Sequence, residues 1–252
     1  MKFSVMTFNL RLDTKDDGDN AWPHRKEAVI ETILSHQPAV LGTQEGLHHM
    51  IEFMATALKD YGKIGQGREG GKKGEYNAIF YKKDVLHLID HGQFWLSETS
   101  DIRGSVSWDS AYPRICTWGR FQLLADPTKE IVIFNTHLDH VSQLARERGI
   151  VSICSHIKLY EKQDIPAILM GDFNCGPDND VIEHVRMMGL DVTHAVGKTF
   201  HDFDGGVEGY PIDYIVKSKA FTTIKSMIDH QTVNQRYPSD HYPVISELEI
   251  DE

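Results

Sequence analysis

The stretch DIPAILMGDFN, residues 164–174, is an apolar run that ends in Asp172 and Asn174. A short apolar run bounded by polar residues is typical of a buried strand. Similar runs recur along the chain, and their ends carry Asn9, Glu45, Asn135 with His137, Asp213, and Asp240 with His241. One polar strand end is commonplace because loops must be polar, but six ends of this kind predict a site at the edge of a rigid sheet scaffold.

The remaining pattern predicts an α/β (α+β) fold. Helical spacing of apolar residues indicates helices over 23–36, 47–59 and 141–160. Strands are expected over 2–10, 38–45, 76–81, 85–96, 115–124, 130–135, 164–174, 211–218, 221–228 and 242–249. Strand-rich halves with interspersed helices predict two packed sheets covered by helices.

The composition and charge of the chain restrict its domain organisation, its partners and its location. The 252 residues are 40% hydrophobic and 25% charged, and no linker, low-complexity tract or repeat divides them, so we expect a single domain over 1–252. The formal net charge of −11 repels polyphosphate backbones and disfavours nucleic acid as a partner. The first ten residues lack the apolar core of a signal peptide, and no stretch has the roughly 18 apolar residues of a membrane span. We expect a cytoplasmic protein with no membrane partner and no obligate protein partner.

Several motifs match other kinds of functional site, but the residues around them do not support those assignments. GQGREG, residues 65–70, matches the dinucleotide fingerprint, yet no helix follows it, so a flexible loop is favoured, with Arg68 solvated rather than touching an anionic substrate. His137 and His140 lie three apart, but no third clustered ligand supports zinc, and His140 is interpreted as a helix-entry or surface residue. Ser239 has Asp and His neighbours only in sequence, so a serine nucleophile is disfavoured.

The residue types at the strand ends favour magnesium and phosphate chemistry. Carboxylate and amide oxygens, with histidine and without cysteine, suit Mg²⁺ or Mn²⁺, which share their remaining coordination sites with substrate phosphate. A carboxylate would position or deprotonate the attacking water, while histidine and asparagine would hydrogen-bond the developing negative charge. The pattern therefore predicts a phosphate ester hydrolase.

Six motifs in order then carry a family resemblance: TFNLR (7–11), GTQE (42–45), NTHLDH (135–140), GDFN (171–174), IDYI (212–215) and PSDHYPV (238–244). Together they resemble the endonuclease/exonuclease/phosphatase superfamily, whose fold is the DNase I-like four-layered αββα sandwich of two packed mixed sheets flanked by helices. WDSAYPRICTW, residues 108–118, is most similar to a bacterial branch related to the deadenylase-like members.

The resemblance implies a role for each motif residue. Glu45 would be the principal metal ligand, Asn9 would help to hold the metal or the attacking water, and Asp240 would lie near the metal. Asp172 would serve the nucleophile or the leaving group. The scissile phosphate would contact a set of hydrogen-bonding residues, namely His137, Asn174 and His241, the last oriented by Asp213. His241→Ala is therefore expected to abolish turnover and to leave the fold nearly unchanged.

Three residues in the long glycine- and serine-containing loop SETSDIRGSVSWDSAYPR, residues 97–114, are further candidates for substrate binding. Arg114 ends the loop, and its fork suits bidentate phosphate contact. Trp108 and Tyr112 lie within this loop, which is long enough to serve as a lid or recognition segment. Arg146 is expected to brace acidic residues from behind the site.

The sequence thus predicts an Mg²⁺- or Mn²⁺-dependent phosphomonoesterase or phosphodiesterase that uses an activated water. A small phosphorylated metabolite or nucleotide is favoured as substrate. The first alternative is a nuclease or deadenylase-type exonuclease acting on single strands, and the second is a non-catalytic binding protein on the same fold. Substrate identity, the number of metal ions and the oligomeric state stay open.

Overall fold

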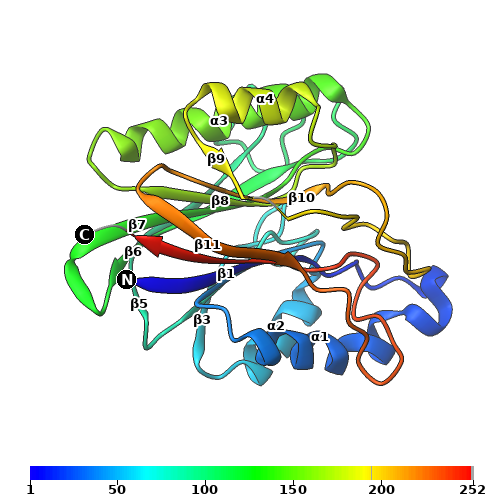
Figure 1. Ribbon diagram of the computed structural model, residues 1–252. Coiled ribbons are helices and arrows are strands. Elements are labelled where there is room, and N and C mark those ends of the chain that lie inside the picture. Colours follow the sequence, from blue (N-terminus) through cyan, green and yellow to red (C-terminus); the bar gives the residue numbers. More distant parts are fainter. Residues whose placement is uncertain (194, 251–252) are drawn as a thin grey trace.

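The computed structural model describes residues 1–193 and 195–250 and shows two stacked six-stranded sheets with helices on both outer faces (Figure 1). The first sheet has the order β11 (Phe221–Ile228), β12 (Val244–Ile250), β1 (Lys2–Asn9), β2 (Val40–Gln44), β4 (Ile79–Lys82), β3 (Tyr61–Ile64). The second has the order β5 (Leu86–Trp95), β6 (Ile115–Leu123), β7 (Asp126–His137), β8 (Ala167–Asp172), β10 (Asp213–Lys217), β9 (Asp191–Val192). This is the expected four-layered sandwich.

The helices complete the outer layers. Helices α1 (Trp22–His36) and α2 (His48–Ala57) cover the first sheet, and α3 (Gln143–Glu161) and α4 (Asp180–Met187) cover the second (Figure 1). Alternation along β1 explains the layering, because Val5 packs between the two sheets whereas Met6 and Phe8 pack beneath α1 and α2. Among the described residues, no helix combines the length and the apolar character needed to cross a bilayer.

Strand direction gathers the polar strand ends at one edge. β1 runs parallel to β2, so Asn9 pairs with Gln44, and β7 runs parallel to β8, so His137 pairs with Asp172. Antiparallel β10 begins where β8 ends, and this register sets Asp213 opposite Asp172. β12 starts beside the end of β1, which brings the preceding residues 238–243 to the same edge.

Gly42 of β2 marks a close approach of the two sheets. A Cβ at this position would stand 2.7 Å from Met170 Sδ and 2.9 Å from the Asn135 side chain. Asn135, one of the predicted strand-end residues, is buried inside this contact. It donates to the carbonyls of Thr43 and Ala78 and accepts from Gln44 Nε2 at 2.7 Å. Asn135 therefore joins the sheets rather than facing the site.

Several boundaries differ from the sequence prediction. The strand expected over 76–81 begins only at Ile79, because Tyr76 forms isolated bridges to Gly46 and Gly67 instead. β7 is longer than the expected 130–135 and starts at Asp126. Four short elements were not predicted: the 3₁₀ helix η1 (Lys15–Asn20), β3, α4 and β9. They are short, and short elements give little periodicity to detect.

Candidate active site

A pocket of about 440 Å³ opens at the edge where the strand ends converge. Its lining combines charged, hydrogen-bonding and aromatic side chains: Arg11, Leu12, Glu45, Arg68, Glu75, Tyr112, Arg114, His137, His140, Asp172, Asn174, Phe200, Ile212, Asp240 and His241. The expected site residues Glu45, His137 and Asp172 are thus brought together.

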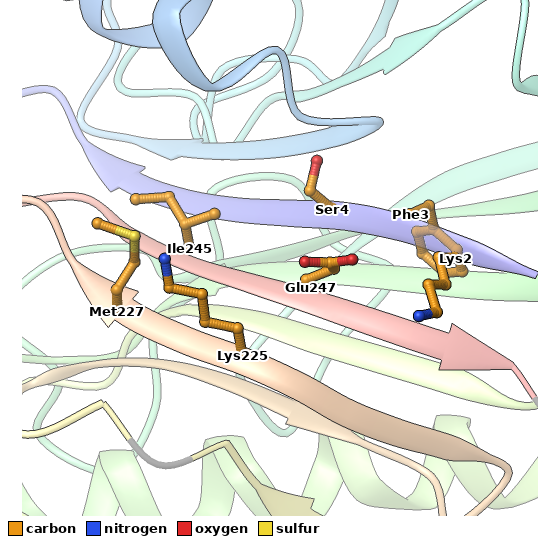
Figure 2. A pocket seen from close by; sticks show the side chains of 7 residues that line it. All are labelled: Lys2, Phe3, Ser4, Lys225, Met227, Ile245 and Glu247. Carbon is orange, nitrogen blue, oxygen red and sulfur yellow. The ribbon is translucent and has the colours of Figure 1, made fainter.

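A hollow of about 340 Å³ on the first sheet differs in chemistry from this pocket (Figure 2). Its side chains come from β1, β11 and β12, and its charged groups are Lys2, Lys225 and Glu247. It contains one carboxylate and no histidine, so it lacks the groups that metal-assisted phosphate chemistry needs.

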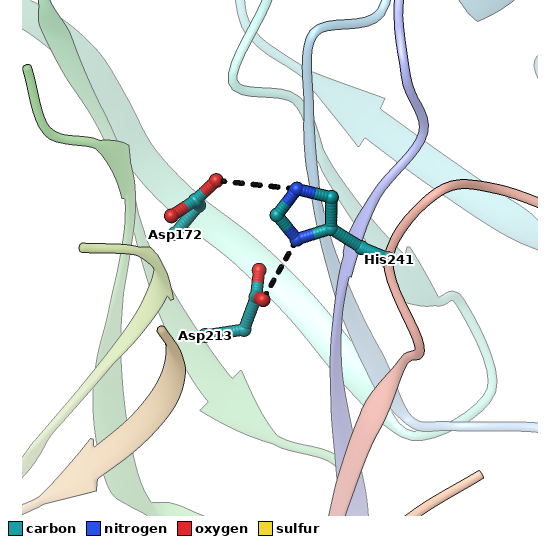
Figure 3. A group of neighbouring side chains, drawn as sticks. All are labelled: Asp172, Asp213 and His241. Carbon is teal, nitrogen blue, oxygen red and sulfur yellow. Dashed lines mark hydrogen bonds and ion pairs between the residues drawn. The ribbon is translucent and has the colours of Figure 1, made fainter. Parts of the chain in front are cut away.

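The centre of the site is His241, which lies between two carboxylates (Figure 3). Its Nδ1 donates to Asp213 Oδ2 at 2.8 Å, and its Nε2 lies 3.8 Å from Asp172 Oδ2. Burial alone would lower the pKa of His241, but the charge and hydrogen bond of Asp213 raise it to about 10. His241 is therefore an imidazolium with a proton on each ring nitrogen, of which Nδ1 donates to Asp213 and Nε2 carries a further donor toward Asp172.

Of the two buried carboxylates beside His241, Asp172 is the one that lines the pocket. Burial, with the nearby charge of Asp213, raises the pKa of Asp172 to about 7. Its Oδ1 accepts from the backbone N–H of Asn174 at 2.9 Å, and its Oδ2 accepts from Asn9 Nδ2 at 3.0 Å. A carboxylate with this pKa can exchange a proton near neutral pH.

The buried ion pair of His241 and Asp213 bears on the expected effect of His241→Ala. His241 and Asp213 are 5% and 1% exposed, so His241→Ala would leave the Asp213 carboxylate buried without its cation. Removing one partner of such a pair costs about 3–5 kcal/mol. The structure therefore predicts a loss of stability for His241→Ala, whereas the sequence-based expectation was a nearly unchanged fold.

Carboxylate oxygens suited to a cation come from two groups. The first is Glu45, which lines the pocket beside the buried Asp240. Burial and the charge of Glu45 raise the pKa of Asp240 although His241 lowers it, which indicates like charges held close together. The second comprises Asp172, Asp213 and His241, with ligand atoms within 4.8 Å of one another. This second group could hold a metal only if His241 gave up its proton, so Glu45 and Asp240 fit a hard cation better.

Asn9, expected to help to hold the metal or the attacking water, faces these carboxylates through its nitrogen. Its Nδ2 donates to Glu45 Oε1 and to Asp172 Oδ2, each at 3.0 Å, while its Oδ1 accepts from the backbone N–H of Arg11. In this orientation Asn9 offers no oxygen to a cation. It instead orients the carboxylates of Glu45 and Asp172, which lie on different sheets.

His137 and Asn174 flank Asp172, as the registers require. His137 Nε2 lies 3.5 Å from Asp172 Oδ2, and burial together with the charge of Arg114 holds the pKa of His137 well below its usual range. Its Nδ1 is buried without a hydrogen-bond partner among the described residues. Asn174 Nδ2 donates to the carbonyl of Leu138. His137 lines the pocket, where a neutral imidazole can donate one hydrogen bond to a bound phosphate.

Asp139 anchors the long loop over the pocket. Its Oδ2 accepts from Ser110 Oγ, the backbone N–H of Ala111 and Arg114 Nε, and its Oδ1 accepts from the backbone N–H groups of residues 141 and 142. Arg114 and Tyr112 thereby line the pocket as expected. Trp108 does not belong to this lining, and its carbonyl accepts from Ser142 Oγ.

Arg146 does not brace acidic side chains. Its guanidinium donates to the backbone carbonyl of Asp139 and to Gln143 Oε1. His140, interpreted from the sequence as a helix-entry or surface residue, has an exposed side chain that nevertheless lines the pocket, and its Nδ1 lies 2.9 Å from Arg114 Nη2. Ser239 is fully buried and donates to the carbonyl of Asn9, which fits its dismissal as a nucleophile.

Sequence reasoning missed the arginines that shape the site. Arg11 closes the TFNLR motif and pairs bidentately with Asp17, and Arg68 of GQGREG pairs with Glu75. Fully buried Arg25 donates to five backbone carbonyls, those of Leu10, Arg11, Leu12, Asn20 and Pro238. The motif position of Arg11 was the one available signal, because the other partners are distant in sequence.

Comparison with known proteins agrees with this geometry. The model of the Endonuclease/Exonuclease/phosphatase family matches residues 6–241. A structure of mannosyl-6-phosphatase from Bacteroides thetaiotaomicron VPI-5482 is 32% identical, with a TM-score of 0.92 over 98% of this chain and 100% of that chain. The human Nocturnin catalytic domain is 18% identical with a TM-score of 0.78 over 99% of this chain and 94% of that chain, and shows a shared fold.

Similarity to curated proteins is more distant. Nocturnin of Drosophila melanogaster is 24% identical over 283 residues, which cover 91% of this chain. The match spans only 42% of the fly protein's own length.

Proposed function

Because the chain belongs to the endonuclease/exonuclease/phosphatase family, whose members are hydrolases of phosphate esters, we propose that it is an Mg²⁺- or Mn²⁺-dependent phosphoesterase. The observation that carries the proposal is His241, an imidazolium held by Asp213 at 2.8 Å and facing Asp172 in the pocket. Asp172, which can accept a proton, thus lies beside His241, which can donate hydrogen bonds to phosphate.

Glu45 and Asp240 would hold the divalent ion, since the partly buried carboxylate of Glu45 and the buried one of Asp240 suit a hard cation. The bound ion would neutralise phosphate oxygens and lower the pKa of a bound water. Asn9 would keep the Glu45 and Asp172 carboxylates in place through its two hydrogen bonds.

Asp172 would orient the attacking water and take its proton. His241 would donate from Nε2 to a phosphoryl oxygen, with Asp213 fixing the ring and stabilising its positive charge. His137 and Arg114, which line the same pocket, would contact the remaining phosphoryl oxygens. The bond between phosphorus and the leaving oxygen would break as the water oxygen adds, and the leaving oxygen would take up a proton from solvent to leave as the alcohol. Asp172 would return its proton to solvent, which restores its carboxylate.

The substrate is proposed to be small. A pocket of about 440 Å³ lies within the range of small-molecule sites. Each pocket arginine already has a carboxylate partner: Arg11 has Asp17, Arg68 has Glu75, and Arg114 has Asp139. Neutralised arginines leave little net attraction for a long polyanion. The mannosyl-6-phosphatase similarity supports the same direction.

A nuclease or deadenylase acting on single strands is the second candidate. Lys72 and Lys73, exposed on the loop that carries Arg68, favour it because they could contact a backbone beyond the pocket. A non-catalytic binding protein would keep the fold without turnover. The cytoplasmic location stays a prediction.

A phosphate-release assay with Mg²⁺ or Mn²⁺, on a panel of phosphomonoesters, diesters and labelled single strands, tests the proposal. We expect release from a small ester, its loss with EDTA, and a fall of about 10²–10⁴-fold in kcat for Asp172→Asn. The matched control is Asp178→Asn, because Asp178 is exposed and lies outside the pocket lining. Activity that resists both EDTA and Asp172→Asn would refute the mechanism, and cleavage of single strands alone would favour the second candidate.

A further inference from the structure

An arginine–glutamate fork lines the pocket together with the proposed phosphate-binding groups. Arg68 Nη1 donates to Glu75 Oε2 and Nη2 lies against Oε1, both at 2.8 Å. The two side chains are 11% and 15% exposed and line the same pocket as His241 and Asp172. Neither residue touches the catalytic carboxylates through a hydrogen bond described above, so the reaction does not by itself account for the fork.

The fork is held rigidly by its own loop. Arg68 N–H donates to the carbonyl of Glu75 at 2.9 Å, and Trp95 Nε1 donates to the carbonyl of Arg68 at 2.6 Å. Gly67 permits the close approach of the two loop arms, because a Cβ there would lie 1.9 Å from the carbonyl oxygen of Lys73. The loop that the sequence indicated to be flexible thus presents two preoriented side chains, a property that favours binding.

Stability does not explain this pair. Burial lowers the pKa of Arg68 and raises the pKa of Glu75, so both groups are charged at a desolvation cost. Arg68 Nε is buried without a hydrogen-bond partner among the residues the structure describes. A buried ion pair is weak evidence for stability, whereas polar groups converging on a pocket are typical of ligand recognition.

The charges of the fork select the chemistry of its ligand. An anion would be repelled by Glu75 and a cation by Arg68. A hydroxyl group both donates and accepts, so it can give its proton to the carboxylate while accepting from the guanidinium. Two adjacent hydroxyls can engage both members of the pair at once. The Tyr112 ring, whose centroid is 4.6 Å from Arg68 Cζ, is already packed against the guanidinium, which reduces its use for stacking a nucleobase.

We propose that Arg68 and Glu75 form a leaving-group subsite that recognises adjacent hydroxyl groups, so that the preferred substrate is a phosphorylated sugar or polyol. This inference rests on the proposed phosphoesterase function and adds a specificity determinant to it. Glu75 acts on substrate choice, and the phosphate chemistry takes place around Asp172 and His241, which line the same pocket.

The test compares hexose 6-phosphates with n-hexyl phosphate, which has the same carbon count and no hydroxyl groups. For the wild type we expect kcat/KM at least about 100-fold higher on a hexose 6-phosphate, since a site built for hydroxyls rejects analogues that lack them. Glu75→Gln should reduce this preference by about 10–100-fold. Glu69→Gln is the matched control, because Glu69 is exposed on the same loop and does not line the pocket, and it should keep the preference.

Two outcomes would overturn the inference. One is a wild type that hydrolyses both esters equally, and the other is a Glu75→Gln variant that keeps the full preference with an unchanged melting temperature. If the wild type hydrolyses neither ester, the wider panel of phosphomonoesters, diesters and single strands decides separately whether the phosphoesterase proposal holds. Calorimetry of the same two ligands with the full chain then decides the subsite: tighter binding of the hexose phosphate that is lost in Glu75→Gln supports it, and equal binding refutes it.

Discussion

His241→Ala should damage turnover and stability together, and the two effects can be separated. The substitution removes the donor that faces the phosphate, and loss of one such donor costs about 10²–10³-fold in kcat, or about 3–4 kcal/mol. It also leaves Asp213, which is 1% exposed, without the imidazolium 2.8 Å away. At about 4 kcal/mol for a broken buried pair, a chain of this size should melt about 10 °C lower.

The double variant His241→Ala/Asp213→Asn removes the unpaired charge. We expect it to recover most of the lost melting temperature in calorimetry at pH 7 and to regain no phosphate release. The reasoning is refuted if His241→Ala keeps wild-type kcat, because then the ring does not serve the phosphate. It is also refuted if the single variant melts within about 2 °C of the wild type, because then Asp213 does not depend on a charged His241.

Three further predictions concern groups around the site. Asp139→Asn weakens the anchor of the loop over the pocket, so KM should rise about 10-fold and trypsin should cut faster at exposed Arg103; unchanged cleavage would contradict this. Arg25→Met removes five backbone contacts and should lower the unfolding free energy by about 3 kcal/mol or more in urea denaturation. Burial lowers the pKa of His201 to about 4, below its unfolded value of about 6.5, so up to about 3 kcal/mol of stability is present above pH 6.5 and lost toward pH 4; His201→Phe should flatten that slope.

The layers and the gathering of the candidate site residues in one pocket could be predicted because they follow from local patterns. Apolar runs such as 164–174 identify the central strands, and ordered motifs place Glu45, Asp172 and His241 on one edge. The orientation of Asn9 could not be predicted, because which of its amide atoms faces the carboxylates depends on Arg11 and on a partner 163 residues away.

The sequence pattern also could not predict that Arg68 and Glu75 line the pocket. Arg68 and Glu75 lie in a glycine-rich segment without periodicity, and only their folded contact shows that they face the pocket. The loop anchor at Asp139 is similar, because it depends on five donors brought together by tertiary structure. Residues of this kind carry no local signal, since their role depends on what the fold places opposite them.

The site is divided between the two sheets, and this has a consequence for how the chain can vary. Asn9 lies on the first sheet and His241 lies in the segment just before β12 of that sheet, while Asp172 and Asp213 lie on the second, and two side-chain contacts cross between them. The alignment of the reacting groups is therefore set by how far one sheet can slide over the other. Gly42 lies at the contact between the two sheets, where an added methyl group would press on Met170 and Asn135. Substitutions in the interior between the two sheets should therefore misalign the reacting groups, and so reduce activity, before they prevent the chain from folding.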